Sequence, residues 1–281
     1  TAAFEPALDY CVVKIPRWPF DKFPGGDRSL GTQMKATGEV MAIDRTFEAA
    51  LQKAVRSMEN GRGSLLWENP DWGGEGPPDL LADDDRLWKL TAAIRGGRTA
   101  ESVTIETGVD PWFTRAIARI VGMERRLLGE ELTPDLMRRA KRMGFSDAQI
   151  GALADYLPEQ VRTMRKDWGL KPVYKMVDTC AGEFEAITPY FYSTYEQENE
   201  AIATGRETAI VLGSGPIRIG QGIEFDYCSV HAAWALQKSG VESVMINSNP
   251  ETVSTDFDTS DRLYFEPLDE ESVRDIIENE G

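Results

Sequence analysis

The last quarter of the chain combines two short apolar runs with an amphipathic stretch. Residues 208–212 and 241–247 are mainly apolar and have the length of buried parallel strands. Between them, residues 226–238 carry apolar side chains at helical spacing, and Gly240 follows as a stop signal. The apolar positions are Val230, Ala233, Trp234 and Leu236. The order of strand, helix and strand predicts the start of a βαβ unit.

The first sixty residues predict two strands and a helix. Residues 8–15 are rich in Val, Ile and Tyr, which favour strands, and residues 38–45 lie between a glycine and a helix-capping residue. Thr46 is expected to cap a helix that reaches Glu59. The apolar face of this helix contains Leu51, Ala54, Val55 and Met58.

The middle of the chain is predicted to be all-α. A glycine- and proline-rich loop over residues 69–79 precedes three adjacent carboxylates, Asp83 to Asp85. Because they lack the alternating spacing of a calcium loop, we interpret them as a solvated cluster at a helix start. Tyrosines and acids over residues 171–206 predict a linker packed against the following unit. The expected helices span 80–95, 111–130, 134–143, 147–155 and 158–168.

Composition and charge disfavour two classes of partner. Lys and Arg total 31 against 47 Asp and Glu, and the net charge of −16 disfavours nonspecific binding to nucleic acids or anionic membranes. No run approaches the roughly 18 to 20 apolar residues of a membrane span, and no signal peptide begins the chain. A length of 281 residues with 41% hydrophobic residues predicts about two domains. We therefore expect a soluble cytoplasmic protein.

Cysteine and histidine give no indication of a metal centre. Cys11, Cys180 and Cys228 are far apart and lack C-x-x-C spacing, which predicts buried free thiols rather than a disulfide framework or a zinc site. His231 is the only histidine. A packed or capping imidazole is the simplest interpretation, because one histidine cannot build a histidine-rich metal site.

One segment offers an alternative function. Residues 146–168 predict two short helices with a tight connection, and Arg162, Arg165 and Lys166 lie on the second. This arrangement imitates a helix-turn-helix module that binds nucleic acid. We favour an all-helical packing domain, since no basic arm or dimer zipper accompanies the pair. The apolar positions Ile150, Leu153, Val161 and Met164 explain the pattern without DNA.

A glycine-rich turn follows the strand at 208–212. The string GSGPIRIG fits the dinucleotide fingerprint G-x-G-x-x-G only in part. Together with the following QGIEFDY and the later NPETVSTDFDTSDRLYFEP, it resembles the start of the C-terminal synthetase half of the carbamoyl phosphate synthetase large subunit. Upstream, CVVKIPRWPFDKF and TGEVMAIDRT resemble the closing strands of the first ATP-grasp unit of that family, and VYKMVDTCAGEF resembles the end of its oligomerisation domain.

The resemblance implies a fold that is α/β plus all-α. Residues 1–58 would form the C-terminal end of the first ATP-grasp unit, and residues 59–206 the helical oligomerisation domain with a linker. Residues 207–281 would form the first βαβ part of a Rossmann-like pre-ATP-grasp domain. On this comparison the chain is an internal piece that joins two synthetase halves, and we expect it to be inactive alone.

The resemblance also implies the reaction of the parent enzyme. That ATP-dependent ligase phosphorylates bicarbonate, forms carbamate with ammonia and phosphorylates the carbamate, supplying carbamoyl phosphate for arginine and pyrimidine synthesis. Implied cofactors are ATP, magnesium or manganese, and potassium. Implied partners are a glutaminase small subunit and further copies of the large subunit, which associate through the helical domain. The resemblance places catalytic residues, metal ligands and ATP contacts outside this chain.

Four positions match the family's passage for carbamate between its two sites. They are Glu39, Gly222, Glu224 and Glu251. Carbamate hydrolyses in water, so an enclosed path is required, and a glycine at position 222 keeps such a path open. Carboxylates would repel an anion unless they are protonated, paired or used to orient water. The alternative is that Glu224 and Glu251 fix the strand-end loops by accepting backbone N–H bonds.

Overall fold

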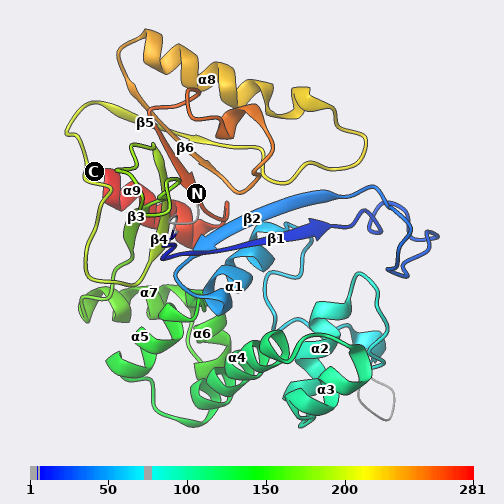
Figure 1. The fold of residues 1–281 in the computed structure, drawn as a ribbon. Helices are drawn as coiled ribbons and strands as arrows, with labels where there is room; N and C mark the ends of the chain where they lie inside the picture. The colour runs from blue at the N-terminus through cyan, green and yellow to red at the C-terminus, as the bar shows by residue number, and fades with distance from the viewer. Residues whose placement is uncertain (1–4, 6, 73–77) are drawn as a thin grey trace.

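The computed structural model describes residues 5, 7–72 and 78–281 (Figure 1). Strands β1 (Cys11–Arg17) and β2 (Gly38–Asp44) form an antiparallel pair, with Lys14 opposite Met41. Helix α1 (Phe47–Ser57) follows, and the Thr46 side chain accepts a hydrogen bond from the Ala49 N–H as its cap. The two strands and the capped helix are therefore confirmed.

Among the described residues, six α-helices form the middle of the chain: the five predicted ones, of which the first begins at Arg86 and not at residue 80, and one addition. Helix α3 was not predicted, because only Ala100 and Val103 are buried in it and it shows no apolar periodicity. Side chains of Thr99, Asp110, Thr133 and Ser146 cap four of the helices. The helices are α2 (Arg86–Arg95), α3 (Ala100–Thr107), α4 (Pro111–Gly129), α5 (Pro134–Arg142), α6 (Asp147–Ala154) and α7 (Pro158–Asp167).

The third part of the chain is a five-stranded sheet of order β3-β4-β7-β6-β5. Strands β5 and β6 are parallel with helix α8 between them in sequence, which confirms the predicted βαβ start. Strand β7 adds in parallel to β6, and helix α9 follows it. The elements are β3 (Val173–Met176), β4 (Tyr190–Thr194), β5 (Thr208–Leu212), α8 (Tyr227–Lys238), β6 (Glu242–Asn247), β7 (Arg262–Phe265) and α9 (Glu270–Glu280).

The segment predicted as a linker belongs to this sheet. Strand β4 pairs in parallel with β7, and β3 pairs antiparallel with β4. Tyr174 of β3 and Tyr192 of β4 are 1% and 0% exposed. Residues 173–176 and 190–194 are therefore strands and not linker, because their backbone N–H and C=O groups pair within the sheet.

Strand β2 lies between two hydrophobic cores. Figure 1 shows it between helices α2–α7, which we call the helical layer, and the five-stranded sheet. Its alternating side chains point to opposite faces. Val40 and Ala42 pack into the core of the helical layer, which also contains Leu51 of α1. Ile43 packs into a second core with Tyr192 and Met245 of the sheet. The N-terminal part of the chain is thus shared by both layers.

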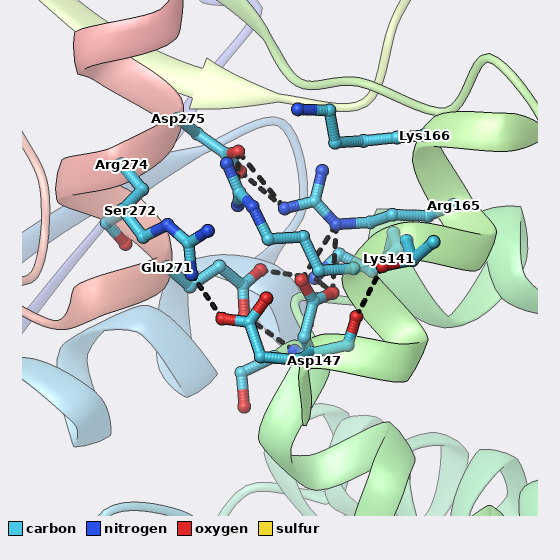
Figure 2. A network of polar contacts seen from close by, with 12 residues as sticks. Lys141, Asp147, Arg165, Lys166, Glu271, Ser272, Arg274 and Asp275 are labelled. Atoms are coloured by element: carbon cyan, nitrogen blue, oxygen red, sulfur yellow. Dashed lines mark hydrogen bonds and ion pairs between the residues drawn. The ribbon is translucent and has the colours of Figure 1, made fainter. Parts of the chain in front are cut away.

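A buried network of charges joins the helical layer to the sheet (Figure 2). Arg165 of α7 is 0% exposed and donates to Asp147 of α6 at 2.8 Å and to Asp275 of α9 at 2.8 Å. Lys141 donates to the same Asp147 at 3.0 Å and pairs with Glu271 at the start of α9. Burial opposes ionisation of Asp147, yet the charges of Lys141 and Arg165 lower its pKa.

The same network removes the basis of the helix-turn-helix alternative. Helices α6 and α7 have the predicted bounds to within one residue, and Ile150 and Val161 are fully buried. Arg162 is 5% exposed and donates to Asp275 at 2.7 Å, while Lys166 pairs with Glu278 at 3.0 Å. The two arginines therefore face carboxylates of α9 and are neither solvated nor free to contact phosphates.

Smaller predictions have mixed outcomes. The Asp83 to Asp85 cluster does not have the solvated form that was predicted, because Asp85 is 4% exposed and pairs with Arg62. The three cysteines are free, but the prediction that they are buried was wrong, because Cys11 and Cys180 are only partly buried and Cys228 is exposed. The His231 ring packs beside Tyr227 and Trp234, at centroid distances of 4.2 and 5.3 Å. Of the predicted loop over 69–79, residues 73–77 lie outside the described residues.

Removing the central arginine should destabilise the fold. Arg165→Met leaves two buried carboxylates without their shared cation, so we expect the free energy of unfolding to fall by about 3 to 5 kcal/mol. Denaturant titration followed by circular dichroism measures this change. The matched control is Lys166→Met on the same helix, whose side chain is 37% exposed and whose loss should cost less than about 1 kcal/mol. Equal stability of the two variants would contradict this role.

The stabilising contribution of Glu278, at the edge of the buried charge network, should be lost at low pH. The hydrogen bond from Arg162, joined by Lys166, lowers the pKa of Glu278 to about 2 from an ordinary 4.5. Its contribution to stability is therefore present above about pH 4.5 and is lost as the pH falls toward about 2. We expect the difference in unfolding free energy between the unmodified chain and Glu278→Gln to shrink across that window. Denaturant titrations at each pH, with exposed Glu131→Gln as the control, measure it; a difference independent of pH would refute the assignment.

Candidate functional site

Two loops at the carboxyl ends of β5 and β6 meet the N-terminal strands. We call this contact the interdomain seam: residues 213–226 and 247–255 on one side, and residues 14–59 on the other. In parallel sheets, ligand sites form at this edge of the strands. The seam contains all four predicted site positions.

Asn247, the last residue of β6, holds the first loop in place. Its side chain is fully buried, and its Oδ1 accepts from the N–H groups of Gly215 at 3.1 Å and Ser248 at 2.9 Å. Its Nδ2 donates to Ser254 Oγ at 2.9 Å. A Cβ at Gly213 would lie 2.4 Å from Asn247 Cγ, so this close approach requires glycine. One amide therefore joins both loops.

Asp226 makes a second connection between the loops. It is 1% exposed, and its Oδ2 accepts from Thr252 Oγ1 at 2.7 Å and from the Ser254 N–H at 2.8 Å. Asp226 ends a short 3-10 turn, Ile223–Asp226, that leads into α8. The carboxylate thus fixes the entry of α8 against the loop that follows β6.

Three backbone N–H groups of the glycine-rich turn donate to other groups of the protein. The N–H of Gly213 donates to Ile246 O at 2.8 Å, and the N–H of Arg218 donates to Gln221 Oε1 at 2.8 Å. The Gly215 amide is held by Asn247, as described. A phosphate cradle needs free N–H groups that point to the ligand. The N–H groups of Gly213, Gly215 and Arg218 are therefore occupied by partners within the protein.

This turn packs directly against the N-terminal part of the chain. Lys22 Nζ donates to Ile219 O at 2.9 Å, and Arg218 pairs with Glu59 at 3.0 Å. A Cβ at Gly38 would lie only 2.0 Å from Ile217 O, a backbone atom. The start of β2 and the glycine-rich turn are therefore in close contact across the seam.

Glu39 and Glu251 meet across the seam at a lysine. Lys14 of β1 places its Nζ 3.1 Å from Glu39 Oε1 and 3.1 Å from Glu251 Oε1. Hydrogen bonds with Glu251 and then Glu39 raise the pKa of Lys14, and the bond from Lys14 is the main cause of the lowered pKa of Glu251. Pairing with a cation is one of the ways in which such carboxylates can tolerate an anion nearby.

Gly222 and Glu224 form a separate pair on the exposed side of the turn. The Gly222 N–H donates to Glu224 Oε1 at 3.1 Å, so Glu224 accepts a backbone bond as the alternative interpretation supposed. Glu251 instead pairs with Lys14 through its carboxylate. In the described part of the chain, no hydrogen bond or ion pair joins Gly222 or Glu224 to the Glu39–Glu251 pair.

No group of three or more metal-ligating side chains lies together within residues 5, 7–72 and 78–281. Over the same residues, no helix is long and apolar enough to cross a membrane. What the seam offers is a set of charged and backbone groups held in fixed positions between two layers.

Comparison with known proteins assigns the chain to a family. Residues 39–169 match the model for the carbamoyl-phosphate synthetase large chain, oligomerisation domain, and residues 205–281 match the carbamoyl phosphate synthase preATP-grasp domain. The carbamoyl phosphate synthase large chain of Thermomicrobium roseum is 60% identical over 285 residues, which cover 100% of this chain. The chain belongs to the carbamoyl phosphate synthase large-chain family.

Two further large chains of this family match the whole chain. That of Caldanaerobacter subterraneus subsp. tengcongensis is 54% identical over 285 residues, and that of Thermoanaerobacter pseudethanolicus is 53% identical over 288 residues. Each match covers 100% of this chain but 26% of the relative. The chain thus spans about a quarter of the length of the carbamoyl phosphate synthase large chains that it matches.

Sequence reasoning missed two residues of the seam. Lys14 was unremarkable because one lysine on a strand is usually a solvated surface charge. Its position in CVVKIPR, within a segment that resembled the family, was the available signal. Asn247 gave a better signal, because an amide that ends a buried strand just before a loop is suited to bond loop amides.

The close contact at Gly38 generates a prediction. Gly38→Ala forces the backbone at Ile217 to move, so we expect the free energy of unfolding to fall by about 1 to 3 kcal/mol. Denaturant titration measures the change. Gly31→Ala is the matched control, because a Cβ there meets no heavy atom within 4 Å. Identical unfolding curves for the two variants would show that the seam is looser than described.

Proposed function

We propose that this chain is the interdomain segment of a carbamoyl phosphate synthase large chain, which joins the two synthetase halves and lines part of a passage for carbamate. The observation that carries the proposal is the meeting of Glu39 and Glu251, from opposite sides of the seam, at Lys14. Both glutamates match motif positions of the family passage, and they come from segments more than 200 residues apart in a chain of 281. A passage between two halves requires such a junction.

The reaction proposed for the parent follows from its family. It phosphorylates bicarbonate with ATP, displaces the phosphate with ammonia to form carbamate, and phosphorylates that carbamate with a second ATP. Magnesium or manganese would accompany each nucleotide, and potassium is a further proposed cofactor. The ammonia would come from glutamine through a small glutaminase subunit, the location would be the cytoplasm, and the product would serve arginine and pyrimidine synthesis.

We also propose self-association through the helical layer. The support is the match of residues 39–169 to the family's oligomerisation domain. No observation favours the nucleic-acid alternative, because Arg162 and Arg165 are buried against α9. The helical layer is therefore proposed as a packing and assembly unit.

Gly222 provides the test of the passage. A Cβ at position 222 would lie 2.2 Å from Glu224 Oε2, so a leucine there displaces the Glu224 carboxylate and fills the exposed rim of the turn. In the full-length large chain we expect Gly222→Leu to lower carbamoyl phosphate formation from bicarbonate, ammonia and magnesium ATP by about tenfold or more. Bicarbonate-dependent ATP hydrolysis should stay within about twofold, because the first phosphorylation does not need the passage.

The control for this experiment is Gly129→Leu, which adds the same side chain at a glycine of α4 with no neighbour within 4 Å of an added Cβ and outside the seam. Phosphate release and carbamoyl phosphate are measured on the same samples. Unchanged synthesis in Gly222→Leu would argue against a passage at this turn. A full-length parent that makes no carbamoyl phosphate would overturn the proposed activity itself.

A further inference from the structure

Lys14 connects three segments that are distant in sequence. It lies on β1, opposite Met41 of β2, and its Nζ reaches Glu39 two residues from Met41. The Met41 N–H donates to Ser248 O at 2.8 Å, which brings the loop after β6 beside β2. Glu251 lies on that loop and accepts the hydrogen bond from Lys14 at 3.1 Å. The lysine thus stands where the two sides of the seam meet.

The two carboxylates at this point have different surroundings. Glu251 has a side chain that is 71% exposed, so water can solvate its charge. The Glu39 side chain is 30% exposed, but its Oε1 has no access to solvent and lies 3.1 Å from Lys14 Nζ. The ion pair with Lys14 therefore compensates the charge on this oxygen, while the ammonium directs its hydrogen bond to Glu251.

We propose that Lys14 is a positioning residue of the carbamate passage, which holds Glu39 and Glu251 together across the seam and neutralises part of their charge. This inference rests on the proposed function. Without the lysine, two carboxylates face each other and any anion that passes, and like charges at such distances repel. With it, the junction keeps one net negative charge and a closed contact between the halves.

A surface ion pair of this kind contributes little to the free energy of unfolding. The role of Lys14 should therefore appear in the coupling of ATP consumption to carbamoyl phosphate formation. If the junction opens, carbamate escapes to water and hydrolyses before the second phosphorylation. The second site then lacks substrate, and ATP already used at the first site yields no product. The ratio of ATP consumed to carbamoyl phosphate formed reports such leakage directly.

The test uses the full-length large chain with bicarbonate, ammonia and magnesium ATP. Lys14→Met should raise the ratio of ATP consumed to carbamoyl phosphate formed by about threefold or more, because the passage leaks. Bicarbonate-dependent ATP hydrolysis, and ATP formation from added carbamoyl phosphate and ADP, should each stay within about twofold. Lys14→Arg, which keeps the charge, should restore most of the coupling. Lys171→Met, at an exposed lysine outside the seam, is the control.

A second-site variant separates charge from shape. Adding Glu251→Gln to Lys14→Met removes one of the two unpaired carboxylates, so the double variant should couple better than Lys14→Met alone. If Lys14→Met does not fold, Lys14→Gln takes its place in the same series.

The outcomes distinguish this inference from the function on which it rests. An unmodified parent that makes carbamoyl phosphate, together with an unchanged ratio in Lys14→Met, overturns the role of Lys14 and leaves the function standing. A ratio that Lys14→Arg fails to restore also overturns it. An unmodified parent without synthesis overturns the proposed function and this inference with it.

Discussion

The arrangement of the whole chain depends on one buried set of charges. Arg165 lies between Asp147 of the helical layer and Asp275 of α9, with no exposure to solvent. Burying ions is costly, and the cost is offset here by pairing each charge with an opposite charge in good geometry. A small shift of α9 against the helices would leave carboxylates unpaired in a dry environment. The network therefore specifies one relative position of the two layers, beyond any stability that it adds.

A second buried pair extends the same constraint to the N-terminal part. Lys53 of α1 is 4% exposed and donates to Glu266, just after β7, at 2.9 Å, with Asp44 of β2 at 3.2 Å. Strand β2 also packs against apolar side chains on both of its faces. Because α1, β2, β7 and α9 are held together in this way, the seam between Glu39 and Glu251 is a consequence of the packing. A passage for an unstable intermediate needs such fixed walls.

Many basic side chains of this acidic chain lie inside the molecule and pair with carboxylates. The chain carries a net charge of −16, yet many of its basic residues are used inside, where they pair carboxylates that come from distant segments. This use of arginine and lysine explains why the basic segment around α7 resembled a nucleic-acid module in the sequence and is an interface between layers in the structure. Composition described the balance of charges but not their location.

Local structure was largely determined by the sequence alone. Thr46 caps its helix as predicted, and the apolar face of α1 is buried, because caps and periodicity depend on neighbours a few residues away. The resemblance of long motifs identified the family and marked Glu39 and Glu251. Tertiary structure alone placed residues 173–176 and 190–194 in a sheet, since β-pairing joins strands that are far apart in sequence. It also decided that Arg165 is buried and that Lys14 joins two glutamates, because the partners of a charged side chain follow from the packing of distant elements and leave no local pattern.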